Sequence, residues 1–194
     1  SGKTVDTFAK SLDDYPSTYN FHESRDYVDY TDDIYVGYRY FETIPGAAEK
    51  VVYPFGYGLS YTTFDVETVS AGVVNSNCTS EANKLYAKVR VTNTGKFSGK
   101  EVVQVYIAKP QGKLGKPAKE LAAFEKTREL QPGESQLMIL TWEINDMASY
   151  DDLGKVKKSA YVLEAGSYDI YVGTSVRDVT KADYSYILNH DVIT

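Results

Sequence analysis

Residues 85–108 have the sequence LYAKVRVTNTGKFSGKEVVQVYIA, and this stretch decides the fold. Apolar and polar side chains alternate at its start, which places four apolar residues on one face of a β-strand: Leu85, Ala87, Val89 and Val91. Residues 93–96 (NTGK) are typical of a tight turn. Residues 101–108 form a second strand, with Val103, Val105 and Ile107 on one face. The stretch therefore predicts two strands separated by a turn.

Strand patterns and turn signals continue on both sides of this stretch. Further strands are predicted at residues 64–74, 121–130, 135–144, 161–163 and 168–173. Turns are predicted at residues 131–134 and 164–167, and a single helical turn at residues 145–150. About seven short strands in this arrangement predict an all-β fold, an immunoglobulin- or fibronectin type III-like β-sandwich.

The apolar faces of the later strands indicate which side chains enter the core. In the strand at residues 135–144 the better core face consists of Met138, Leu140, Trp142 and Ile144. In the strand at residues 168–173, Tyr168, Ile170 and Val172 point the same way. The tail at residues 181–194 contains a strand-like stretch at residues 184–188, which is either a last strand or an exit towards a following domain.

The first 60 residues have a different character from the rest. They are rich in Asp, Tyr and turn residues and show no sustained helical or strand period, apart from one extended or short helical element at residues 29–40. Such a segment supplies no second apolar layer, so it must lie on something else. The chain is therefore predicted to divide into residues 1–60, the tail of a neighbouring domain with a linker, and residues 61–194, the sandwich.

Composition excludes several classes of partner. The net charge is −6, and the basic residues are interspersed with acids, so a nucleic-acid partner is not expected. The apolar runs are far shorter than the roughly 20 residues that span a bilayer, so no membrane partner is expected. The single cysteine, Cys78, excludes an internal disulfide framework and a thiolate metal site. Asn77-Cys78-Thr79 matches the N-glycosylation pattern, a pattern that also arises often by chance.

The segment at residues 53–64 (YPFGYGLSYTTF) carries a family resemblance. It resembles the joint between the α/β sandwich domain and the fibronectin type III-like domain of family 3 glycoside hydrolases of the β-glucosidase type. The residues also suit a fixed linker, because Pro54 restrains one torsion angle while Gly56 and Gly58 allow tight bends. The aromatic rings beside them can wedge between two cores.

Further stretches resemble the same family in the same order. Residues 34–40 (IYVGYRY) are similar to the last element of the α/β sandwich domain, and residues 91–106 to the second and third sandwich strands. Residues 117–134 resemble the next hairpin, and residues 166–178 (GSYDIYVGTSVRD) the closing strand. The resemblance covers roughly residues 1–180 and implies a C-terminal fragment of such an enzyme. An Asp32-Asp33 pair stands where the family often has Glu-Gly.

The resemblance implies a parent that hydrolyses terminal β-linked sugars with retention of configuration, but it implies no catalytic residue in this chain. Retaining glycosidases use two carboxylates about 5–5.5 Å apart. In this family the nucleophile is an aspartate of the (β/α)8 barrel and the acid/base is usually a glutamate in an earlier part of the α/β domain; neither motif occurs here. No catalytic, cofactor-binding or metal-binding residues and no cofactor are therefore expected. The expected partners are the barrel and α/β domains, in the same chain or a separate one, and a glycoside substrate through them.

Individual residues that suggest chemistry have simpler interpretations. The pairs Asp13-Asp14, Asp32-Asp33 and Asp151-Asp152 are expected in solvated loops, because neighbouring carboxylates on an extended chain point to opposite faces. Surface positions are expected for His22 and His190, and neither Ser60 nor Ser135 has the sequence context of a nucleophile. Trp142 is expected in the core rather than as a sugar platform. Arg39 is expected to hold a local carboxylate, with proximity to the parent's cleft as the alternative.

The sequence leaves several alternatives open. The leading function is a scaffold that supports the catalytic domains, with the Lys/Gly/Pro-rich loop at residues 109–117 as a candidate border of the cleft entrance. The rival is an autonomous carbohydrate-binding or adhesion module, in which some of the 18 tyrosines form a sugar-facing surface. The start at Ser1 and the lack of a methionine before Met138 suggest a fragment or processed chain. The compartment stays open, with the cytoplasm slightly favoured, as do the sugar and the position of the barrel.

Overall fold

The computed structural model describes residues 2–74 and 83–194; the possible glycosylation pattern at residues 77–79 lies outside them. Its elements are strands β1–β12, one α-helical turn α1 and four 3₁₀ helices η1–η4. In chain order they are β1 (Phe8–Ala9), η1 (Leu12–Asp14), η2 (Pro16–Tyr19), α1 (Tyr38–Phe41), η3 (Ala47–Lys50), β2 (Val51–Tyr53), β3 (Phe64–Val73), β4 (Lys84–Asn93), β5 (Val102–Ala108), β6 (Glu120–Lys126), β7 (Ser135–Glu143), η4 (Asn145–Met147), β8 (Ser149–Asp151), β9 (Ala160–Leu163), β10 (Gly166–Gly173), β11 (Val179–Leu188) and β12 (Val192–Ile193). Within these ranges no helix has the length and apolar character to cross a membrane.

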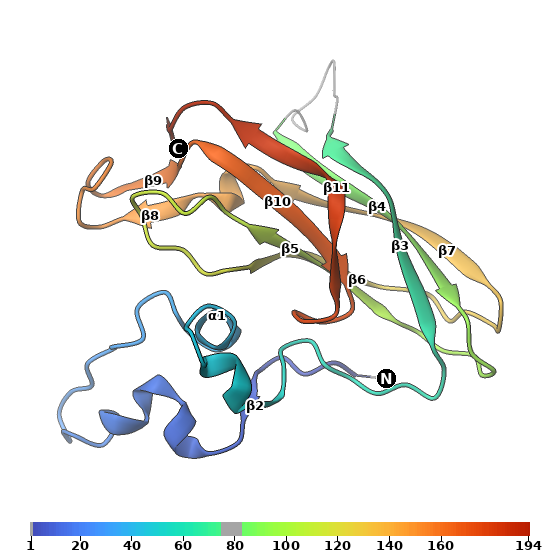
Figure 1. The fold of residues 1–194 in the computed structure, drawn as a ribbon, viewed down its shortest axis with the longest axis horizontal. Helices are drawn as coiled ribbons and strands as arrows, with labels where there is room; N and C mark the ends of the chain where they lie inside the picture. The colour runs from blue at the N-terminus through green and yellow to red at the C-terminus, as the bar shows by residue number, and fades with distance from the viewer. Residues whose placement is uncertain (1, 75–82) are drawn as a thin grey trace.

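Two antiparallel sheets face each other and form the sandwich (Figure 1). One sheet has the strand order β11-β10-β5-β6, and the other has the order β3-β4-β7. Ladders of paired residues join the neighbours, for example Leu85 to Trp142 between β4 and β7, and Val105 to Val172 between β5 and β10. The all-β, fibronectin type III-like sandwich that the sequence predicts is confirmed, and its seven strands agree with the expected number.

The core between the sheets consists of the faces that alternation predicts. Leu85, Ala87, Val89 and Val91 of β4 are all fully buried. The predicted face of β7, including Leu140, lies beside them in the same sheet, and the predicted faces of β5 and β10, including Val105 and Ile170, lie opposite; all belong to one hydrophobic cluster. Burial of these side chains is the main favourable term for the fold, at about 1.5–3 kcal/mol for each large side chain.

One of the seven predicted sandwich strands, at residues 161–163, does not belong to the sandwich. Residues 161–163 belong to β9, which pairs with β8 and β12 in a separate three-stranded sheet at one end of the sandwich. The seventh place is taken by β11, which pairs with β10 at the edge of the four-stranded sheet. The strand-like stretch at residues 184–188 therefore belongs to a sandwich strand. β9 resembles a core strand in sequence because Val162 and Leu163 are buried, and Leu163 belongs to the core cluster of the sandwich.

The expectation that all three aspartate pairs are solvated is wrong for Asp151. Its side chain is completely buried, and its carboxylate accepts hydrogen bonds from four successive backbone N–H groups, those of residues 154–157, at 2.7–3.0 Å. These bonds hold the loop between β8 and β9, in which Gly154 has a φ of 78°. The carboxylate therefore fixes a loop, and its neighbour Asp152 is exposed.

The first 60 residues form a second layer under one sheet, in which short elements replace a core. Figure 1 shows α1 and its flanking loops below β5 and β6, on the side of that sheet away from β3 and β4. Strands β1 and β2 pair with each other, and α1 is a single turn that overlaps only residues 38–40 of the element predicted at residues 29–40. Only two hydrophobic side chains of this segment, Phe41 and Ala47, are buried among the described residues.

Core and surface leucines of β7 provide a matched test of the sandwich. Leu140 is 3% exposed and Leu137 is 50% exposed. We expect Leu140→Ala to lower the free energy of unfolding by about 2–5 kcal/mol, because it leaves a cavity in the core. Leu137→Ala should change it by about 0.5 kcal/mol or less. Urea unfolding of both variants measures this difference, and equal losses would contradict the observed orientation of β7.

The buried Asp151 carboxylate predicts that the stability of the fold falls at low pH. Burial raises the pKa of Asp151, but the four backbone hydrogen bonds outweigh it and hold the pKa below its usual value of 3.8. The ionised form is thus favoured in the folded state, and its stabilising contribution is lost as the pH falls below 3.8 through the lower folded-state pKa. We expect the stability difference between the wild type and Asp151→Asn to be constant above about pH 5 and to shrink in more acidic solution. Asp65→Asn, at an exposed position of β3, is the control and should change the stability by about 0.5 kcal/mol or less.

Candidate functional site

Aromatic side chains connect the N-terminal layer to the sandwich. The ring of Tyr38, at the start of α1, lies 4.6 Å from that of Phe55 and 6.2 Å from that of Tyr106 on β5, measured between centroids. The Tyr38 hydroxyl accepts a hydrogen bond of 2.9 Å from the backbone N–H of Leu121 on β6. We call this contact the seam: residues 37–57 on one side, residues 104–121 and 174–177 on the other. Phe55 comes from the YPFGYGLSYTTF segment, whose aromatic rings do wedge between the two layers.

A buried polar network occupies the centre of the seam. The amide of Gln104 donates to the carbonyl of Thr174 at 2.8 Å and to that of Gly56 at 3.4 Å, and it accepts from the hydroxyl of Tyr106. A Cβ on Gly56 would lie 2.3 Å from the Gln104 amide oxygen, so the close approach requires glycine. Burial, assisted by Tyr38 and Glu42, raises the pKa of Tyr106 far above its usual range. The hydroxyl therefore stays protonated and acts only as a fixed hydrogen-bonding group.

The loop at residues 109–117 is held by a buried ion pair. The carboxylate of Glu164, from the turn before β10, accepts from the Lys116 ammonium group and from the backbone N–H groups of Lys113 (2.6 Å) and Leu114 (3.2 Å). The side chains of Lys116 and Glu164 are 1% and 4% exposed. Because a buried charge is tolerated only when it is paired and hydrogen-bonded, this cluster fixes the loop that the sequence proposes as a border of the cleft entrance.

Polar contacts at the edge of the seam hold α1 and η3 to the end of β10. Arg177 donates to the carboxylate of Glu42 at 2.7 Å and to the carbonyl of Ala48 at 3.0 Å. Lys119 donates to the carbonyl of Val176 at 2.9 Å, and its partial burial lowers its pKa while Glu42 opposes the shift. The two Arg177 contacts join residues more than 100 positions apart in the sequence and hold the N-terminal layer in a fixed orientation on the sandwich.

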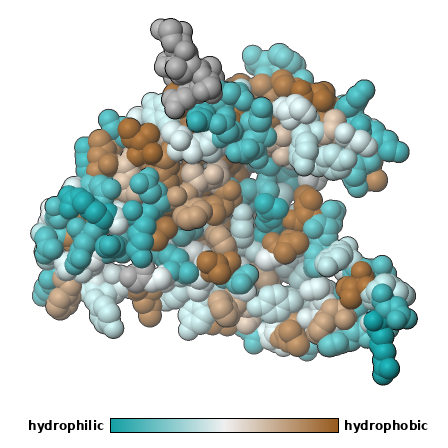
Figure 2. Space-filling model, turned by 180° about the vertical axis from the view of Figure 1, so that it is seen from behind, coloured by the Kyte–Doolittle hydropathy of each residue, from teal (hydrophilic) through white to brown (hydrophobic). Residues whose placement is uncertain are grey.

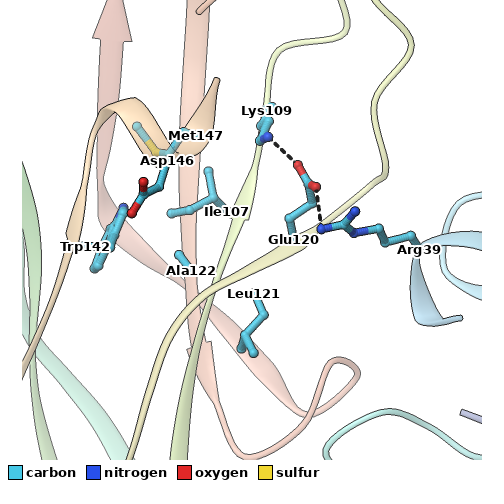
Figure 3. Close-up of a pocket in the computed structure, with 9 residues that line it drawn as sticks. All are labelled: Arg39, Ile107, Lys109, Glu120, Leu121, Ala122, Trp142, Asp146 and Met147. Carbon is cyan, nitrogen blue, oxygen red and sulfur yellow. Dashed lines mark ion pairs between the residues drawn. The ribbon is translucent and has the colours of Figure 1, made fainter. Parts of the chain in front are cut away.

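A pocket of about 260 Å³ opens between α1, β5, β6 and η4 (Figure 3). Glu120 pairs there with Arg39, at 3.1 Å, and with Lys109. Ile107, Ala122 and Met147 supply apolar surface, and Trp142 lines the same pocket. Arg39 thus holds a carboxylate, as predicted, but that carboxylate comes from β6 rather than from a neighbouring position in the sequence.

The other residues singled out from the sequence do not converge on one site. His22 and His190 are exposed, as predicted, and the ring of His22 lies against Phe21. The predicted core position of Trp142 is confirmed at 5% exposure. Ser60 and Ser135 are both exposed. In the described ranges no group of three or more His, Cys, Asp or Glu could hold a metal ion. The absence of catalytic and cofactor residues remains a prediction.

Sequence reasoning missed the second buried face of β5 and the buried carboxylate of Glu164. Gln104 and Tyr106 are 4% and 0% exposed, although alternation places them on the face away from the core. A signal was present, because the near-continuous apolar run of residues 102–107 (VVQVYI) is typical of a strand that is covered on both faces. Glu164 gave no comparable signal, since its partners lie about 50 positions away.

Large apolar side chains are exposed mainly on the N-terminal layer. Of the 24 exposed large hydrophobic residues in the described ranges, 14 lie within residues 5–61, including Tyr30 (91%), Leu59 (75%) and Tyr61 (96%). Figure 2 shows brown surface on the lobe that this layer forms, and a hollow between that lobe and the end of the sandwich. Concentrations of apolar surface of this kind mark interaction sites.

Comparison with known proteins connects this architecture to one family of enzymes. Residues 101–176 match the family model "Fibronectin type III-like domain". Over its whole length the chain is 60% identical to β-glucosidase A of Butyrivibrio fibrisolvens, of which it covers 24%. The chain is homologous to a segment of family 3 β-glucosidases. The identification from the sequence, a fragment of such an enzyme with its fibronectin type III-like domain, is confirmed.

Solved structures extend the likeness to the whole chain, N-terminal layer included. The β-glucosidase of Paenibacillus barengoltzii superposes with a TM-score of 0.90 at 48% identity, over 99% of this chain and 21% of that one. The family 3 β-glucosidase of Bifidobacterium adolescentis superposes with a TM-score of 0.81 at 33% identity, over 97% of this chain and 26% of that one. The chain thus spans about a fifth to a quarter of the length of the β-glucosidases it matches.

The buried Glu164–Lys116 ion pair predicts a large loss of stability when one of its two charges is removed. Glu164→Gln leaves the Lys116 ammonium group buried without its counter-charge, and we expect it to lower the free energy of unfolding by about 3–5 kcal/mol. The matched control is Glu67→Gln, which breaks the pair with Arg90, whose side chains are 56% and 49% exposed; it should cost about 0–1 kcal/mol. Chemical denaturation compares the two variants. If both losses are small, Glu164 does not hold the loop as described.

Proposed function

We propose that the chain is the non-catalytic scaffold portion of a retaining, β-glucosidase-like exo-glycosidase and supports that enzyme's catalytic domains. The observation that carries this proposal is the asymmetry of residues 2–61. Their inner side is fixed to the sandwich by the polar and aromatic contacts of the seam, while their outer side exposes apolar side chains. A surface that is rigidly mounted and apolar suits a permanent contact with further domains.

Homology supports the identity of those domains. The relatives named β-glucosidase are about four to six times longer than the segment they share with this chain, which leaves room for the (β/α)8 barrel and the remaining α/β domain that the sequence resemblance implies. The scaffold role requires no catalytic group in this chain, in agreement with the motifs that the sequence lacks. The loop at residues 109–117, fixed by Glu164, is the proposed border of the cleft entrance.

A domain exchange tests the proposal. The homologous segment of Butyrivibrio fibrisolvens β-glucosidase A is replaced by this chain, and hydrolysis of an aryl β-glucoside is measured. We expect the chimera to keep the KM and substrate preference of the parent, because the exchanged segment holds no group that touches the substrate. The chain alone should give no turnover. Turnover by the chain alone, or a chimera with a new sugar preference, would contradict the scaffold role.

Charged substitutions in the chimera test the exposed apolar surface itself. We expect Tyr30→Asp combined with Leu59→Asp to shorten the half-life of heat inactivation about tenfold, since each carboxylate would be buried against the added domains. Tyr150→Asp combined with Leu153→Asp is the matched control, at positions that are 53% and 71% exposed on the β8–β9 end. That control should behave like the unmodified chimera. Equal effects of the two pairs would show that the surface is not a specific contact.

A further inference from the structure

The pocket beside Arg39 has the charge pattern of a site for a neutral ligand. Two cations, Arg39 and Lys109, and two carboxylates, Glu120 and Asp146, line it, so their formal charges cancel. An anion entering the pocket would meet the carboxylates, and a cation would meet the guanidinium and ammonium groups. A neutral molecule with several hydroxyls avoids both penalties, because each hydroxyl can donate to a carboxylate or accept from a cation.

A buried donor in this pocket has no partner. The indole Nε1–H of Trp142 is inaccessible to solvent and makes no hydrogen bond within the described ranges, although Trp142 is 5% exposed and lines the pocket. Buried donors are normally satisfied, and one left without a partner destabilises the fold. Figure 3 shows the indole nitrogen on the side of the Asp146 carboxylate, across the pocket from Lys109, Glu120 and Arg39. Because the nitrogen is covered, a hydroxyl group that accepts from the indole N–H and donates to Asp146 requires a small shift of the side chains over it.

The size of the pocket limits the ligand to one small ring. Its volume of about 260 Å³ lies just below the range of about 300–1,000 Å³ that is typical of sites for drug-sized ligands. Its apolar wall, formed by Ile107, Ala122 and Met147, suits the C–H faces of a sugar ring. The polar groups lie at opposite sides of this wall, which suits hydroxyls that point outward from a ring (Figure 3).

We propose that this pocket binds a neutral polyhydroxylated molecule of monosaccharide size, with one hydroxyl between Trp142 and Asp146 and others at the Glu120 ion-pair cluster. The site would lie at the edge of the seam, so the bound ring would contact both Arg39 of α1 and the sandwich. The proposal is independent of the scaffold role, because it concerns a ligand of this chain and requires no catalytic domain. A ligand of this size with ordinary efficiency binds with a dissociation constant on the order of 1 mM.

The indole N–H of Trp142 is itself the probe for the experiment. The chain contains one tryptophan, so a ¹H–¹⁵N spectrum of the 194-residue chain has one indole resonance. We expect glucose to move this resonance saturably at concentrations up to about 50 mM. Glucuronate and glucosamine, an anion and a cation of the same ring size, should bind at least about tenfold more weakly, since each meets two like charges. A resonance that glucose leaves unmoved would overturn the proposal and leave the pocket to water alone.

Two variants and a control locate the binding. Asp146→Ala removes the proposed acceptor and should weaken glucose binding about tenfold, and Ala122→Leu should abolish it by filling the pocket. Asp65→Ala, at an exposed position of β3 in the other sheet, should bind like the wild type. Thermal unfolding establishes that each variant is folded before titration. If Asp146→Ala binds glucose as tightly as the wild type, the bridging hydroxyl is wrong and the proposal fails.

Discussion

Strand β5 is covered on both faces, and the rest of the structure depends on this constraint. Val103, Val105 and Ile107 face the other sheet, while Gln104 and Tyr106 face the N-terminal layer. A sandwich strand with one solvated face would need polar side chains there, and β5 has a buried tyrosine and a buried amide instead. The N-terminal layer, which has almost no core of its own, is therefore part of the folded unit rather than an appendage.

The second face of β5 is polar as well as apolar, and this determines how the layer is held. Apolar contacts tolerate sliding, but each buried hydrogen-bonding group must find its partner, since an unpaired one costs about 1–3 kcal/mol. The Gln104 amide meets the carbonyls of Thr174 and Gly56, and the Tyr38 hydroxyl meets the N–H of Leu121. Together these bonds admit one orientation of α1 on the sheet. Orientation is what a scaffold between domains has to supply.

The sequence predicted the sandwich and most of its core because alternation within a strand is local. The buried faces of β4, β7 and β10 follow from it directly.

The prediction from the sequence failed where burial depends on distant segments. β11 is an edge strand with half-buried tyrosines, so its pattern is weak, and the short β9 has a core-like pattern inside a different sheet. Asp151 has the turn context of a residue that binds its own loop, a signal that the pairing with Asp152 obscured. The pocket beside Arg39 did not follow from the sequence as a whole, since its lining comes from five separate elements, α1, β5, β6, β7 and η4.

The seam has two parts that differ in how their polar groups are satisfied. Around Gln104 and Tyr106 the donors and acceptors pair with each other, and a glycine at position 56 permits the close approach. Around Trp142 the same seam opens into a pocket in which one donor is left over. If the pocket were only an imperfection of packing, a water molecule would suffice and a single apolar substitution would fill it at little cost. A cluster of balanced charges around a buried donor would then destabilise the fold without a return, because Glu120 and Lys109 are both largely desolvated there. The arrangement is accounted for when a neutral ring with outward hydroxyls completes the hydrogen bonds that the protein leaves open.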